Sequence, residues 1–79
     1  MHTAEVPGRK NLVLALRKIG DADAVPLLRH IALFDPAPDV RVEAEWTLKT
    51  WAVAKDARGE KARAALRELD ERRAREEAG

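Results

Sequence analysis

The stretch Asp35-Pro36-Ala37-Pro38 constrains the fold more than any other part of the sequence. Each of its prolines disfavours the helical region for the residue before it, so a helix that reaches Asp35 has to end there. Apolar side chains nevertheless repeat at helical spacing on both sides of this stretch. The chain therefore has to fold as separate helices joined by a sharp turn. The segment 35–52 contains that turn and the start of a helix that carries both tryptophans.

Helical periodicity predicts the organisation of the whole chain. Residues 1–7 show no period and are predicted to form a flexible lead. The predicted repeat core covers residues 8–55, with helices near 8–19, 23–34 and 39–54. Residues 56–79 are predicted to form a charged C-terminal capping helix that frays at its end, because its last turns offer only alanine for burial.

Local signals at the helix ends agree with these boundaries. Gly20 can end the first helix in the left-handed conformation, and Asp21 or Asp23 can cap the second. Pro26 then falls in the first turn, where its missing N–H costs little. Asp39 is predicted to cap the third helix, and Asp56 or a neighbour begins the fourth.

Each predicted helix has one apolar face that should form the core. The expected core positions are Leu12, Ala15, Leu16 and Ile19, then Ala24, Leu27, Leu28, Ile31 and Phe34, then Val40, Ala44, Thr47, Leu48 and Trp51, and finally Ala62, Ala65, Leu66 and Leu69.

An internal repeat relates the two halves of the chain. A shift of 32 residues places the first helix on the third, pairing Leu16 with Leu48, and a shift of 35 residues places the second on the fourth, pairing Ile31 with Leu66. Because stacked helix pairs bury their core only between neighbours, one side of the first helix lacks cover. The chain can dimerise there, dock on a partner subunit, or belong to a longer array.

The runs IGDADAVPLL and DPAPDVRVEA, within residues 8–54, resemble the short bacterial HEAT-like repeat, the type also found in phycobilin lyases. The resemblance implies an all-α fold, a short α-solenoid of about four helices arranged as helix pairs. It also implies that Asp39 and Arg41 tie neighbouring repeats together and that the second helices line the concave surface. Trp51 stands where an aliphatic residue is usual and is expected to enlarge the core. A bilin-lyase-like activity rests on this resemblance alone.

Composition narrows the function further. The chain has 79 residues, no cysteine and a net charge of +1, which predicts at most one domain, no cysteine-based metal site and no strong overall attraction to nucleic acid. No apolar run approaches the roughly 20 residues that span a bilayer, and we expect a cytoplasmic protein. The two histidines are His2, in the lead expected to be flexible, and His30, which has no partner to orient it for catalysis or metal binding. No catalytic, cofactor or metal signature is present, so no enzyme and no cofactor are predicted.

Trp46 is the most informative residue for function. At about 100° per residue it lies well away from the core side of its helix. An exposed tryptophan with apolar neighbours and a polar rim is typical of a protein-binding hot spot. The predicted partner-binding residues are Trp46, Leu14, Val42 and Val53, bordered by Lys10, Arg17, Lys18 and Lys49. The predicted function is a non-enzymatic interaction or assembly module that binds a protein partner or itself.

Two alternatives use the same surface. The fourth helix or the N-terminal lead can fold over the strip and make it ordinary core. A nucleic-acid-binding module can instead use the basic side chains of the first and third helices, although Glu43 and Glu45 dilute their charge. These side chains are Arg9, Lys10, Arg17, Lys18, Arg41 and Lys49.

Overall fold

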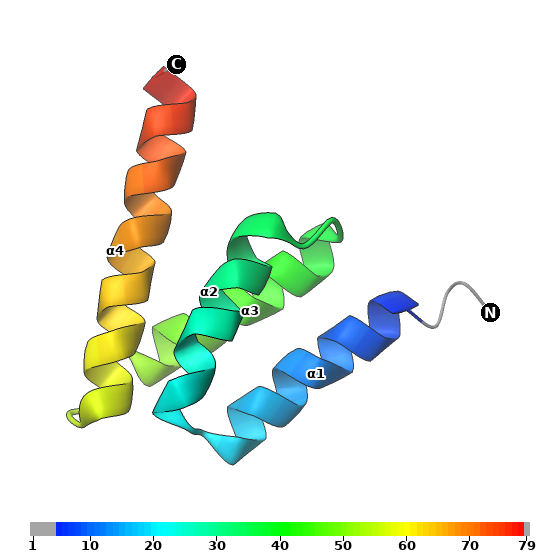
Figure 1. The fold of residues 1–79 in the computed structure, drawn as a ribbon, viewed down its shortest axis with the longest axis vertical. Coiled ribbons are helices and arrows are strands. Elements are labelled where there is room, and N and C mark those ends of the chain that lie inside the picture. The colour runs from blue at the N-terminus through cyan, green and yellow to red at the C-terminus, as the bar shows by residue number, and fades with distance from the viewer. Residues whose placement is uncertain (1–4, 79) are drawn as a thin grey trace.

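The computed structural model describes the backbone of residues 5–78 and the side chains of residues 9–78. It is an all-α domain of four α-helices and one short 3-10 turn (Figure 1). The elements are α1 (Glu5–Ile19), η2 (Ala22–Ala24), α2 (Val25–Phe34), α3 (Pro38–Trp51) and α4 (Ala57–Ala78). None of these helices is both long and apolar enough to cross a bilayer.

The helices lie in two orientations. In Figure 1, α1 and α3 both run toward the lower left, and α2 and α4 both run upward. The α3 helix packs on each of the other three helices, and α2 also packs on α4. The domain measures 39 × 36 × 15 Å along its principal axes. Since its shortest dimension is only about one and a half helix diameters, most helices keep one side exposed.

The first helix begins earlier than the sequence predicted. Residues 5–7 belong to α1 instead of a flexible lead, and the rest of that lead, residues 1–4, lies outside the described residues. Pro7 is compatible with this start because the first N–H groups of a helix have no intrahelical partner. The end of α1 is as expected: Gly20 has φ of +70°, and its N–H donates to the carbonyl of Leu16 at 3.0 Å.

The turn between α2 and α3 corrects one predicted cap. Asp39 lies inside the first turn of α3, and the N-cap is Ala37, whose side chain cannot cap. No side chain caps α3. The carboxylate of Asp35 instead accepts the N–H of Ala37 at 2.9 Å, which closes the turn before the helix. Pro38 occupies the first helical position, which its fixed φ favours.

The tie that the family resemblance implied for Asp39 and Arg41 is also different. Asp39 is exposed, and its side chain makes no hydrogen bond or ion pair within residues 9–78. Arg41 donates to the carbonyl of Asp35 at 2.7 Å, within the turn that precedes its own helix. The link between helices comes instead from Arg9 on α1, whose Nε lies 2.8 Å from the mostly buried carboxylate of Asp35.

The core is centred on α3. All five positions predicted for that helix are buried, as are most of those predicted for α4. The predictions for α1 and α2 are wrong in part, because Leu12, Ala15, Ile19, Leu27 and Phe34 are exposed. Positions missed by the sequence analysis take their place: Val13, Val25 and Ala32.

The start of α4 is held closely against the end of α3. Asp56 caps α4 as predicted, accepting the N–H groups of Arg58 at 3.1 Å and Gly59 at 3.3 Å. Arg63 donates to the carbonyls of Ala52 and Ala54 at 2.7 and 3.1 Å. The α3 helix ends at Trp51, before the predicted residue 54. The α4 helix continues to Ala78, and its C-terminal half extends beyond the other helices in Figure 1.

Candidate protein-binding face

Trp46 lies on the surface of α3, as its helical position predicted, with 53% of its area exposed. Together with Val42, Glu45 and Lys49 it lines a shallow hollow of about 260 Å³. Val42 is also largely exposed. The fourth helix does not fold over this strip. The other possible cover was the N-terminal lead, residues 1–7, whose side chains lie outside the described part of the structure. The structure thus presents an indole beside an aliphatic side chain, framed by one acid and one base.

Arg17 of α1 connects the indole to the rest of the fold. Its guanidinium carbon lies 4.5 Å from the centroid of the Trp46 ring. The same group donates to the hydroxyl of Thr47 at 2.9 Å and to the carboxylate of Glu43 at 2.7 Å. Thr47 is fully buried, and its own hydroxyl donates to the carbonyl of Glu43 at 2.9 Å. Arg17 therefore fastens α1 to α3 and also covers one side of the tryptophan.

The other predicted partner-binding residues are not all close to Trp46. Leu14 and Val53 are exposed, but neither lines the hollow that contains Trp46. Lys49 lines the hollow and pairs with Glu45 at 3.3 Å. Lys10 is half-buried and Lys18 is exposed. The structure thus brings Trp46, Val42, Lys49 and Arg17 together.

Glu45 on α3 and Arg73 on α4 form an ion pair that the sequence analysis did not predict. Two nitrogens of Arg73, on α4, meet the two carboxylate oxygens of Glu45, one of them at 3.1 Å. The hydrogen bonds from Arg73 hold the pKa of the Glu45 carboxyl below its ordinary value of 4.5, assisted by the charges of Arg73 and Lys49 and opposed by partial burial. The pKa of Arg73 is raised by the same contact. No sequence signal indicated this pair, because it depends on the angle at which α4 crosses α3.

Replacing Glu45 with glutamine is expected to lower the free energy of unfolding at pH 7 by about 0.2–1 kcal/mol, since the Arg73 side chain is partly exposed and solvent screens the pair. Because the pKa of Glu45 is lowered in the folded state, its contribution is complete above the unfolded pKa and is lost as pH falls through the folded pKa. Urea unfolding from pH 6 to pH 3 should show a shallower acid loss in E45Q than in the wild type. Glu60→Gln, at an exposed position, is the control. An unchanged slope in E45Q would contradict this account.

The basic side chains proposed for nucleic-acid binding are mostly engaged within the chain. Arg9 pairs with Asp35, Arg17 with Glu43, and Lys49 with Glu45. Arg41 is bonded to a backbone carbonyl. Binding to phosphates draws its affinity from cations that replace counterions on the nucleic acid. Four of the six candidate cations would first have to give up a partner in this structure.

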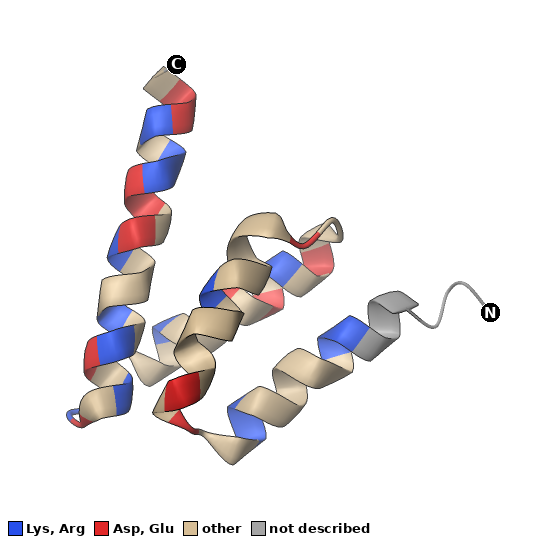
Figure 2. Cartoon of the chain, in the orientation of Figure 1, with Lys and Arg blue, Asp and Glu red and all other residues tan. Residues whose placement is uncertain are grey.

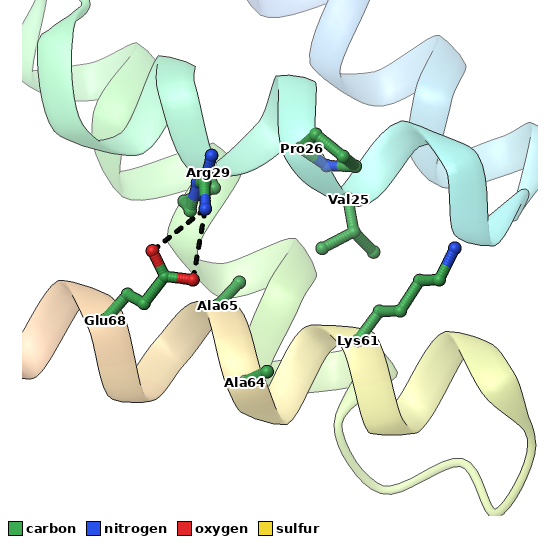
Figure 3. A pocket seen from close by; sticks show the side chains of 7 residues that line it. All are labelled: Val25, Pro26, Arg29, Lys61, Ala64, Ala65 and Glu68. Atoms are coloured by element: carbon green, nitrogen blue, oxygen red, sulfur yellow. Dashed lines mark hydrogen bonds and ion pairs between the residues drawn. The ribbon is translucent and has the colours of Figure 1, made fainter.

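A second hollow, of about 180 Å³, lies between α2 and α4 (Figure 3). Its walls are apolar or small, and Arg29 closes one end by bonding both carboxylate oxygens of Glu68, at 3.0 and 2.9 Å. Lys61 stands at the other end. The carboxylate of Glu68 in the lining is therefore paired with a guanidinium.

Within the described part of the chain, no three of the residue types that bind metals lie close enough to share an ion. Comparisons with protein-family models, curated proteins and solved structures found no match to this chain. Any statement about its function therefore rests on the residues themselves.

Proposed function

We propose that this chain is a non-enzymatic protein–protein interaction module whose binding face is centred on Trp46. The observation that carries the proposal is the half-exposed indole in a hollow that it shares with Val42. Each Å² of apolar surface removed from water stabilises a complex by about 25 cal/mol. We therefore expect the burial of Trp46 and Val42 to supply most of the binding free energy of a partner. Glu45 and Lys49 at the rim supply orientation and exclude water more than they add affinity.

Arg17 supports this reading in a second way. A guanidinium held over one side of an indole fixes its orientation before any partner arrives. Because Arg17 is itself held by Glu43 and Thr47, the tryptophan loses little freedom on binding. Preorganised aromatic side chains of this kind are common anchors of protein interfaces.

We further propose that the two successive helix pairs form a short HEAT-like solenoid. The support is the internal repeat together with the common directions of α1 with α3 and of α2 with α4 (Figure 1). In such a stack α1 and α3 are neighbouring second helices, and Leu14 of α1 is the repeat counterpart of Trp46 on α3. The binding face then lies along one lateral surface of the stack, as expected for proteins that use repeats to present an extended surface.

Trp46→Ala is expected to change the free energy of unfolding by about 1 kcal/mol or less, because the side chain is half-exposed and loses mainly its contact with Arg17. Proteins that co-purify with the tagged wild-type chain should be retained about tenfold less by this variant or weaker still, as expected for a hot-spot residue. Leu27→Ala, which truncates an exposed apolar side chain on α2, is the matched control and should retain them.

Two results would contradict the proposal. Equal retention of the same partners by Trp46→Ala and the wild type would show that the indole is not the anchor. A loss of stability in Trp46→Ala as large as that of a core truncation would show that the indole belongs to the core.

Nucleic-acid binding remains a weaker candidate, because the structure engages most of the required cations. It predicts binding to duplex or single-stranded DNA that weakens steeply between two salt concentrations. The bilin-lyase-like alternative predicts a change in the absorbance of added bilin.

A further inference from the structure

The two charged residues in the hollow lined by Trp46, Val42, Glu45 and Lys49 are engaged to different degrees. Glu45 has a side chain that is 19% exposed, and each of its carboxylate oxygens accepts from a nitrogen of Arg73. Lys49 has a side chain that is 63% exposed, and its ammonium reaches the same carboxylate at 3.3 Å. Because an ammonium has three N–H donors, this one ion pair leaves Lys49 with donors for a partner.

The rest of the lining is apolar. Val42 is largely exposed. The ring of Trp46 is open toward the hollow, because Arg17, which lies over the ring, is not part of the lining. The indole N–H can donate a hydrogen bond but cannot accept one. A partner that fits this hollow therefore combines an apolar side chain with a hydrogen-bond acceptor.

The helix that reaches Trp46 through Arg17 adds positive charge. In Figure 2 the described side chains of α1 include basic residues and no acidic ones. Arg9 and Arg17 have acidic partners, whereas Lys10 and Lys18 form no ion pair within residues 9–78. Lys10 lies seven residues before Arg17, close to two full helical turns, so both are on the same side of α1. This side of α1 therefore carries a cation that no acid of the described chain neutralises.

Two acids of α3 lie near the hollow but do not line it. Glu43 is bonded to Arg17. Asp39 is exposed and lies seven residues before Trp46, about 10 Å away along the helix. A polar group that enters the hollow therefore meets the ammonium of Lys49 and not a free carboxylate. A lysine or arginine of a partner would face a like charge there, which is unfavourable across an interface.

Resting on the proposed function of Trp46, we infer that the protein segment bound at this face is acidic. A large apolar side chain of the segment packs on the indole and Val42, and an aspartate or glutamate near it in sequence accepts hydrogen bonds from Lys49. A neutral segment would remove the ammonium from water without replacing its lost hydrogen bonds. An acidic segment needs only one available cation, whereas binding to a nucleic acid draws on several.

A library of random linear peptides, displayed through their C-termini and selected on the immobilised full chain, tests this inference. Peptides attached in this way offer carboxylates only from their side chains. The recovered peptides should contain a large apolar residue and more aspartate and glutamate than lysine and arginine. A synthetic copy of the most enriched peptide, amidated at its C-terminus, should bind more weakly in fluorescence polarisation as the salt concentration rises.

Lys49→Glu should weaken binding of that peptide by about tenfold or more, because it places a like charge opposite the carboxylate. Lys49→Gln should weaken it by less, because it removes the cation and adds no repulsion. Lys55→Glu is the matched control, since Lys55 is an exposed lysine outside the hollow, and it should bind as the wild type does. Both lysines are exposed, so the helical circular dichroism of each variant should match that of the wild type.

The outcomes separate this inference from the proposed function. Peptides that require Trp46 but show no excess of acids would overturn the inference and leave the proposed function standing, as would an enriched peptide that binds Lys49→Glu as tightly as the wild type. If no recovered peptide loses binding in Trp46→Ala, both are overturned. Displacement of the bound peptide by single-stranded DNA at the same concentration would assign these donors to a nucleic acid and would also overturn the acidic segment.

Discussion

Replacing Trp51 with alanine is expected to lower the free energy of unfolding by about 3 to 5 kcal/mol, the usual cost of truncating a buried tryptophan. Trp51 is 4% exposed at the end of α3, and the guanidinium of Arg58 lies 5.4 Å from its ring centroid. A chain of this size rarely gains more than about 3 to 5 kcal/mol from its core. The Trp51→Ala variant should therefore be largely unfolded at 37 °C. Heating it while circular dichroism is recorded should show little or no cooperative transition.

Trp46→Ala is the control for this experiment, because it removes the same side chain from the same helix at an exposed position. The two variants should differ by about 2 kcal/mol or more. If Trp51→Ala unfolds with nearly the wild-type midpoint, the burial of this residue does not hold the helices together, and the core described above is wrong.

Gly59→Ala is expected to cost about 3 kcal/mol or more, which places it among severe overpacking changes. A Cβ at Gly59 would stand 1.8 Å from the carbonyl oxygen of Ala54 and 2.6 Å from its carbonyl carbon. Both are backbone atoms, so relief requires the first turn of α4 to move away from the end of α3. Chemical denaturation should show this loss of unfolding free energy. The same movement would also disturb the hydrogen bonds from Arg63 to the carbonyls of Ala52 and Ala54.

Gly20→Ala provides the comparison. The one close contact of its added Cβ would be with Nη1 of Arg58, at 2.6 Å, which is the end of a flexible side chain. The remaining cost is that of an L-residue at φ of +70°, about 1 to 2 kcal/mol. A larger loss in Gly20→Ala than in Gly59→Ala would contradict the close backbone approach at Gly59.

The sequence predicted α3 best because this helix has neighbours on several sides. The side of α3 that its helical period predicts to face the core is the buried side, and Val40, Ala44 and Leu48 have no exposed area. The turn of prolines, the glycine stop at Gly20 and the cap at Asp56 were also predictable, because each depends on local backbone chemistry.

The face of α1 was not predictable in the same way. The repeat places Leu12 and Ile19 in the core, and they would be buried if another helix pair preceded them. Within the described chain α1 packs mainly on α3, and Val13 is its fully buried residue. Gly59 could not be identified either, because nothing in the local sequence specifies how closely α4 approaches α3.

The candidate face was predicted in part. Helical geometry alone placed Trp46 and Val42 outside the core, and their exposure confirms that placement. The engagement of Arg17 with Glu43 and the bond between Arg73 and Glu45 depend on how the helices cross. Periodicity describes one helix at a time, so it does not report on such contacts.

The double engagement of Arg17 makes the indole and the attachment of α1 thermodynamically linked. A ligand that competes with the guanidinium for the ring would loosen the hold of α1 on α3, and a ligand that leaves the guanidinium in place would tighten it. By reciprocity, a second ligand that binds more tightly when α1 is released would change affinity at Trp46 by the same factor by which the Trp46 ligand changes its own affinity.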